Sequence, residues 1–420
     1  MAFLSSFKFL SYRLSSEVVV LSKLRIVEVG DFISAPFCTK MFADLGAEVI
    51  KIEEPGIGDS SRRYGPFFDD RPDKERSGLF IYLNSNKIGV TLNLNTSQGR
   101  EIMGRILKKA DIFVTNISLD QRKKWKLRYN DFISLYPSLI YCSITPYGTE
   151  GPYKDYKGFD LQCCAISGTS WAIGDPEREP LQMPLFLCDY QAGINGAAAS
   201  MSALIGKRKS GKGEYIDISA SDVMASYVGS NSILYIFYGL QWRRAGKRAY
   251  GSGGFYPYGI FRCKDGYVCI ICRTKKDWEG FIKSIGHPDW ADDLRYQEPA
   301  QIGRDYPDEV DSLLEPILMK LTKEELFELA KKWQFPLAPL RNIQEAIEEP
   351  QLSFRNFFSK VKHPKGGSFF LPNPPYHFSN RNRISIRPAP LLGEHNNMFY
   401  GDRLGFSPVK LRELREREII

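Results

Sequence analysis

The first 286 residues contain no histidine, and only four histidines follow in the remainder of the 420-residue chain. Chemistry in which histidine acts as the base is therefore excluded from that part of the sequence. No uninterrupted apolar run of about 18 residues is present, which argues against a membrane-spanning helix. The eight cysteines stand mostly in apolar or strand-like surroundings, so we expect reduced, buried thiols in a cytoplasmic protein without a metal site.

The charge balance is mixed: 57 basic residues stand against 49 acidic ones, for a net charge of +8. This balance argues against a nucleic-acid-binding protein but suits an anionic ligand. Candidate phosphate contacts before residue 160 are Arg62, Arg63, Lys87, Lys123, Lys124, Lys126 and Lys157. Residues 1–20 are Ser-rich with one acid, which fits either a peripheral extension or a targeting segment.

Apolar strand-like runs alternate with helical patterns from Leu24 onwards. The strands are expected at 24–29, 47–52, 111–115 and 139–144, and the helices at 35–45, 98–109, 129–136 and 191–204. This alternation predicts an α/β fold, with a parallel sheet that binds its ligand at the carboxyl ends of the strands. The later run YGIFRCKDGYVCIIC predicts a hairpin that turns at Lys264-Asp265-Gly266, within a smaller α+β domain. From Pro336 the sequence becomes Pro-rich and irregular, and the charges of its last ten residues are typical of a solvated helix.

The turn after the first strand, from Gly30 to Pro36, has one glycine where a dinucleotide site needs three. NAD or FAD binding is therefore disfavoured, although a helix start there can still bind an anion. Asp189 follows a short apolar run and precedes a helical pattern. Composition alone favours a helix cap for Asp189 over an active-site carboxylate, and the two roles are compatible. The glycines from Gly251 to Gly254 fit either a movable loop or an interdomain link.

Several segments in one order resemble the class III CoA-transferases, the formyl-CoA transferase and carnitine CoA-transferase type, which are related to α-methylacyl-CoA racemase. They include ADLGAEVIKIEEPGIGDSSR, LNSNKIGVTLNL, PSLIYCSITPYGTEGPYKDYKGFD, LCDYQAGINGAAASMSAL, PLAPLRNIQEAIEEPQLSFRNFF and PLLGEH. The resemblance implies a Rossmann-like CoA-binding domain and a smaller α+β domain in an interlocked-ring homodimer. The large domain would comprise 21–228 and a return segment, 336–420, with the small domain at 245–335.

The same resemblance implies that Asp189 is the nucleophile and that a glycine loop of Gly251, Gly253 and Gly254 covers it. The CoA site would comprise Ile33, Ser34, Leu92, Asn93, Leu94, Asn116, Ile117, Ser118, Lys124, Lys157, Gly158, Phe159 and Asp160. Two positions depart from formyl-CoA transferase, with Ile33 in place of Gln and Glu54 in place of Arg. No cofactor beyond CoA itself, as substrate and product, is implied.

The expected reaction moves CoA from an acyl-CoA donor to a carboxylic acid through aspartyl anhydride and aspartyl-CoA intermediates. The racemase branch needs a histidine where this chain has Phe159, which has no titratable group. An acyl-CoA racemase and a non-catalytic CoA-binding protein remain the alternatives. Aromatic residues near the expected pocket, namely Phe159, Tyr190, Phe255 and Tyr256, suggest a medium-sized acid, such as a dicarboxylate with succinyl-CoA as donor. They could equally pack against the pantetheine arm of CoA.

Overall fold

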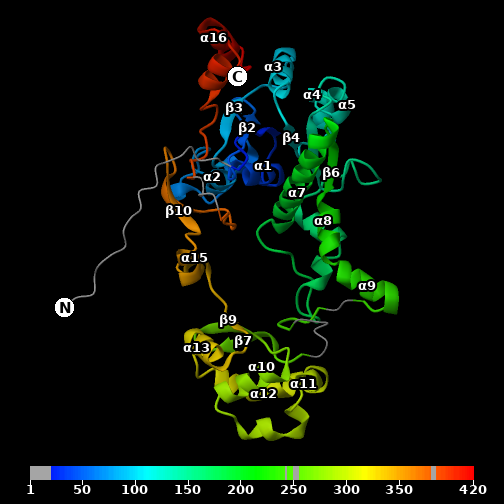
Figure 1. Cartoon of the computed structure of the whole chain (residues 1–420), viewed down its shortest axis with the longest axis vertical. Coiled ribbons are helices and arrows are strands. Elements are labelled where there is room, and N and C mark those ends of the chain that lie inside the picture. The colour runs from blue at the N-terminus through cyan, green and yellow to red at the C-terminus, as the bar shows by residue number, and fades with distance from the viewer. Residues whose placement is uncertain (1–19, 242–243, 249–254, 380–384) are drawn as a thin grey trace, which may run out of the picture. The chain divides into compact units, whose positions relative to one another are not determined.

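The computed structural model describes residues 20–241, 244–248, 255–379 and 385–420 (Figure 1). The chain divides into two compact units. Unit 1 comprises the chain up to Cys163, Phe186–Val223 and Arg355–Ile420, and unit 2 comprises Cys164–Leu185 and Met224–Phe354.

Unit 1 is built on a six-stranded parallel sheet with the strand order β3-β2-β1-β4-β5-β6. Its strands are β1 (Arg25–Val29), β2 (Glu48–Glu53), β3 (Ile88–Thr91), β4 (Ile112–Thr115), β5 (Ile140–Thr145) and β6 (Tyr215–Ser219). Strands β3, β4 and β5 are buried throughout, as expected when helices cover both faces of a parallel sheet. The predicted α/β class and its parallel sheet are confirmed.

The crossover helices of unit 1 start at side-chain caps or pack through small residues. They are α1 (Ser34–Ala43), α2 (Gly78–Asn84), α3 (Ser97–Leu107), α4 (Leu119–Trp125), α5 (Tyr129–Phe132) and α7 (Leu187–Ser210). Helix α6 (Asp160–Ile166) begins in unit 1 and ends in unit 2. Thr96 caps α3 by accepting from the Gly99 N–H. Gly193 of α7 lets this helix approach α1, because an added Cβ would lie 2.7 Å from the Ser34 carbonyl oxygen.

The C-terminal segment completes the core of the same sheet. It contains the hairpin β10 (Phe358–His363) and β11 (Gly367–Pro372), and the helix α16 (Pro408–Glu416). Leu411 and Leu414 of α16 are buried in one cluster with Val27 of β1. The expectation of a solvated helix is therefore wrong, because one face of α16 carries apolar residues that pack on the sheet core.

Unit 2 has its own core around a three-stranded antiparallel sheet of β7 (Tyr258–Cys263), β8 (Gly266–Ile271) and β9 (Leu337–Pro339). Strands β7 and β8 form the predicted hairpin, with Lys264 and Asp265 at its turn. The helices of this unit are α9 (Gly229–Tyr238), α10 (Lys275–Ser284), α11 (Pro299–Asp305), α12 (Pro307–Leu318), α13 (Lys323–Trp333), α14 (Ile343–Ile347) and α15 (Pro350–Phe354). Helix α8 (Ala220–Tyr227) continues from unit 1 into unit 2. The segment after Pro336 is thus more regular than its prolines suggest.

Within the described ranges, no helix combines the length and the apolar character needed to cross a membrane.

Candidate active site

A cavity of about 230 Å³ opens at the carboxyl ends of β1 to β4 in unit 1. Parallel strands direct their loops to this edge, so it is where an α/β sheet binds a ligand. Three of the predicted CoA residues line the cavity: Leu92 and Leu94 after β3, and Ile117 after β4. Trp125 of α4 adds an aromatic surface, and its indole N–H donates to the Asn95 side chain at 2.9 Å.

Asn116 holds the end of β4 against the turn that follows β1. Its amide nitrogen donates to the Asp31 carbonyl oxygen at 2.7 Å and to the Ser34 hydroxyl at 2.9 Å, and its side-chain oxygen accepts from the Asp31 N–H. Ile33 and Ser34 are buried at the start of α1. The predicted residues Ser34 and Asn116 therefore lie together and shape the turn at the sheet edge.

A cluster of buried charged side chains lies next to the same edge of the sheet. The Lys51 ammonium contacts Glu28 at 2.7 Å and Asp59 at 2.6 Å, and Lys87 contacts the other Glu28 oxygen at 2.8 Å. Asp59 also accepts from the backbone N–H of Phe32 at 3.1 Å. The cluster thus ties the loops after β1 and β2 together and fixes the wall of the cavity.

The loop after β1 is also joined to the start of α7 by an aromatic contact. Phe32 and Phe186 both have left-handed backbone angles, with φ of 61° and 56°. Their ring centroids lie 5.1 Å apart, and Tyr64 contacts both rings edge-on. Such backbone angles are unfavourable for a bulky residue and mark a position that the surrounding packing enforces. Phe186, the N-cap of α7, is therefore fixed against the sheet edge.

Asp189 lies in the first turn of α7 and is partly buried. Since it is four residues before Gly193, it shares the helix face that meets α1 near Ser34. The cap interpretation from composition is wrong, because Phe186 is the N-cap and Asp160 does the capping. The buried Asp160 carboxylate accepts from the Cys188 N–H at 2.7 Å. Asp189 therefore does not cap α7, and its carboxyl group can serve another role.

Burial, together with the neighbouring charge of Asp160, raises the pKa of Asp189 to about 7. The first turn of a helix favours an anion, so burial and the second carboxylate outweigh the helix dipole here. A carboxyl group that titrates near neutral pH is a common property of catalytic acids and nucleophiles.

The remaining predicted residues are more dispersed. Ser118 caps α4, and Lys124 is exposed on that helix. The side chain of Asn93 donates to the Glu418 carbonyl oxygen at 3.2 Å. Lys157 and Phe159 are exposed after β5, and Gly158 lies against Tyr147 and Pro146. Gly251, Gly253 and Gly254 lie outside the described residues.

Some sequence expectations at the pocket are wrong. Arg62 and Lys87 do not face a phosphate, because both are buried in ion pairs with glutamates. Tyr256 is in the core of unit 2, where its hydroxyl donates to Asp311 at 2.7 Å.

Sequence reasoning also missed residues that line the cavity. Asp31 and Asp59 are two of them, and burial, with the nearby charge of Asp59, raises the pKa of Asp31. A carboxylate directly after a β-strand of the expected sheet was the available signal for Asp31.

Comparisons with known proteins agree with this architecture. A family model described as CoA-transferase family III matches residues 21–396. A succinyl-CoA:glutarate CoA-transferase of Homo sapiens is 28% identical over 400 residues, which cover 95% of this chain and 90% of that protein. An (R)-2-hydroxy-4-methylpentanoate CoA-transferase of Clostridioides difficile is 30% identical over 405 residues, covering 96% of this chain and 100% of that protein. A crystal structure of a CAIB/BAIF family protein from Brucella suis superposes with a TM-score of 0.80 at 28% identity, covering 90% of this chain and 98% of that one.

The raised pKa of Asp189 predicts how its replacement changes stability with pH. Because the folded protein holds this proton more tightly than the unfolded chain, stability falls as pH rises from the ordinary aspartate pKa of 3.8 to the folded-state pKa of about 7. Asp189→Asn removes the ionisation, so at pH 8 the variant should be more stable by about 1–3 kcal/mol. Urea unfolding at pH 4 and pH 8 measures this. The gain should vanish at pH 4, and an equal gain at both values would contradict the raised pKa.

Proposed function

Because the chain belongs to CoA-transferase family III and is an enzyme of that class, we propose that it moves CoA from an acyl-CoA donor to a carboxylic acid, with Asp189 as the nucleophile. The observation that carries the assignment is the Asp189 carboxyl group in the first turn of α7. It shares the α7 face that meets α1 near Ser34, and its pKa is raised to about 7. This carboxyl group accordingly titrates near neutral pH and is less stabilised by water than a surface aspartate.

The reaction runs as two matched exchanges. The Asp189 carboxylate attacks the thioester carbonyl of the donor, which forms a mixed anhydride and releases the CoA thiolate. The thiolate then attacks the aspartyl carbonyl, so that the donor acid leaves as its carboxylate and Asp189 carries CoA as a thioester. The acceptor carboxylate attacks this thioester, and the released thiolate takes the acceptor acyl group from the second anhydride. Asp189 returns as a free carboxylate.

The cavity at the carboxyl ends of β1 to β4 suits the adenosine part of CoA. Leu92, Leu94 and Trp125 offer an apolar and aromatic surface to the adenine ring, and Glu54 offers an acceptor to a ribose hydroxyl. Exposed Lys124 and Lys157 are the cations we assign to the phosphates. Water would hydrolyse the anhydrides, and we assign its exclusion to the loop of Gly251, Gly253 and Gly254.

The proposal predicts the loss of transfer when the carboxylate is removed. Asp189→Ala and Asp189→Asn should lower kcat by at least about 1,000-fold with the fold intact, because each removes the nucleophile. Mass spectrometry of the quenched wild-type reaction should find CoA or an acyl group on Asp189. Asp222→Asn, which changes another first-turn acid, on α8, is the matched control and should keep full activity. Full activity in the Ala variant would refute the assignment.

For the substrates, we propose succinyl-CoA as the donor and a medium-sized acid, such as a dicarboxylate, as the acceptor. Ile33, in the position of a family glutamine, removes a hydrogen-bonding group suited to small polar acids. The human relative is named for succinyl-CoA and glutarate, and the Clostridioides difficile relative for a branched hydroxy acid.

A panel of acids tested with succinyl-CoA, acetyl-CoA and formyl-CoA decides the substrate class. We expect dicarboxylates with succinyl-CoA to give the highest kcat/KM, and oxalate with formyl-CoA as the best pair would contradict the Ile33 argument. A 2-methylacyl-CoA incubated in deuterated water should stay unlabelled at its α-carbon, because Phe159 cannot move a proton. Label uptake at the rate of turnover would indicate a racemase instead.

We further propose an interlocked homodimer. The exposed apolar side chains at the end of α9 support a partner, because Ile236, Phe237 and Tyr238 are each 74% exposed in the single chain. Sedimentation from about 0.1 to 10 µM should give one dimeric species, since threaded subunits cannot separate without unfolding. A folded monomer that appears on dilution would contradict the threading. The eight free cysteines, seven of them buried, suit the cytoplasm, which we propose as the compartment.

A further inference from the structure

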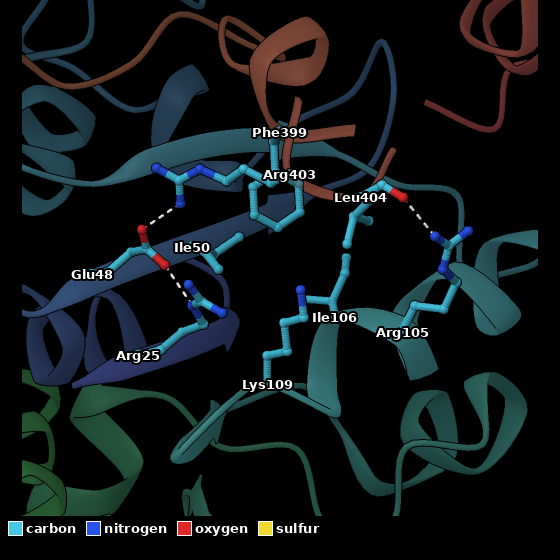
Figure 2. Close-up of a pocket in the computed structure, with 9 residues that line it drawn as sticks. All are labelled: Arg25, Glu48, Ile50, Arg105, Ile106, Lys109, Phe399, Arg403 and Leu404. Atoms are coloured by element: carbon cyan, nitrogen blue, oxygen red, sulfur yellow. Dashed lines mark hydrogen bonds and ion pairs between the residues drawn. The ribbon is translucent and has the colours of Figure 1, made fainter. Parts of the chain in front are cut away.

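A second cavity of unit 1, about 290 Å³ in volume, lies at the amino ends of the strands (Figure 2). Arg25 begins β1 and Glu48 begins β2, and both line this cavity. Val29, at the other end of β1, lines the cavity at the carboxyl ends. Four residue steps along a strand separate the two positions by about 13 Å. The two cavities therefore open at opposite edges of the sheet.

The lining of this amino-edge cavity is strongly positive. It comprises four basic side chains, one acidic side chain and four apolar ones: Arg25, Arg105, Lys109, Arg403, Glu48, Ile50, Ile106, Phe399 and Leu404. Two arginines share the one carboxylate, since Arg25 and Arg403 each bind a different oxygen of Glu48. Burial opposes the ionisation of Glu48, but these two arginines lower its pKa, so the carboxylate stays charged. Three positive charges remain uncompensated by the lining.

Two of the cations have donors available for a ligand. Arg105 donates from one nitrogen to the Leu404 carbonyl oxygen at 2.6 Å. The other N–H groups of its guanidinium remain available to a ligand. Its neighbour in the lining, Lys109, donates from its backbone N–H to the Ile106 carbonyl oxygen, but its side-chain ammonium makes no hydrogen bond or ion pair with any residue of the described ranges. Figure 2 shows this side chain at the cavity beside Ile106. A lysine without an internal partner and an arginine with spare N–H groups are suitable donors to an oxyanion.

The preference for basic residues at a helix C-terminus accounts for only part of this arrangement. Arg105 and Lys109 are at the C-terminal end of α3, where cations complement the helix dipole. Arg25 comes from β1 and Arg403 from the C-terminal segment, and both reach the same cavity. Basic side chains from three separate parts of the chain thus line one cavity, together with the apolar side chains of Ile50, Ile106 and Phe399.

From the excess of charge and these apolar side chains, we infer that this cavity binds a small organic dianion, a doubly charged oxyanion group on a short apolar body. The oxyanion group lies between Lys109 and the arginines, and the apolar body covers Phe399 and Ile106. Because the site joins β1, β2 and α3 to the C-terminal segment, the bound ligand holds that segment on the sheet and stabilises unit 1. This makes the cavity an effector site, separate from the proposed CoA site.

Calorimetric titration with phenyl phosphate, at constant ionic strength set with sodium chloride, tests the inference. We expect saturable binding with a Kd of about 1 mM or tighter, and weaker binding of inorganic phosphate and of benzoate, which lack the apolar body or the second charge. Lys109→Gln should weaken the affinity about tenfold by removing a charge-assisted donor. Glu48→Gln should strengthen it, because both arginines lose their internal anion. The thermal unfolding temperature should rise with phenyl phosphate in the wild type.

The matched control is Lys108→Gln, which changes the neighbouring lysine of α3 that does not line the cavity. This variant should bind phenyl phosphate as the wild type does, and an equal loss in both lysine variants would show only diffuse attraction. Saturating CoA should not displace the probe, and displacement would refute a separate site. Absence of saturation up to about 10 mM would refute the inference outright. Binding is measured without turnover, so Asp189→Ala should bind the probe normally even if the proposed transfer reaction proves wrong.

Discussion

The buried cluster of Glu28, Lys51, Asp59 and Lys87 is the constraint on which the sheet edge depends. All four side chains are at most 3% exposed, so none is stabilised by bulk water. Burial alone would raise the pKa of Glu28, but the two lysines lower it to about 2. Removal of one partner from such a cluster typically costs about 3–5 kcal/mol, because an unpaired charge is left inside. The cluster therefore holds the loops after β1 and β2 in one arrangement, and with them Phe32, Phe186 and the start of α7.

Two buried carboxyl groups of unit 1 differ in their ionisation. Glu28 is surrounded by cations and stays ionised, whereas Asp189 has a second carboxylate nearby and holds its proton to about pH 7. Burial acts in the same direction on both groups, so the sign of the neighbouring charges decides the difference. Unit 1 thus keeps one carboxylate as a permanent part of its framework and another close to its point of ionisation.

The sequence predicts the parts of this architecture that repeat along the chain. Alternating strands and helices give the parallel sheet of unit 1, and the turn at Lys264 and Asp265 gives the hairpin of unit 2. Local patterns fail where distant residues meet. Asp189 resembles a helix cap by composition, but its helix is capped by Asp160, which is 29 positions earlier. Tyr256 resembles a pocket residue but is bonded to Asp311, and Arg62 resembles a phosphate ligand but is paired with Glu53. Each error concerns a polar partner that only the folded chain brings near.

The position of the C-terminal segment in the core has a consequence for the order in which the protein is made. Ile419 and Ile420 are buried in one cluster with Val27, nearly 400 positions earlier. Ribosomes deliver the chain from its N-terminus, so β1 and its neighbours emerge long before the side chains that cover them. All of unit 2, whose core is drawn from 256–337, is synthesised in the interval and can fold on its own contacts. The apolar surface of unit 1 therefore stays incomplete until the C-terminal segment has been made, and until then it is exposed to aggregation.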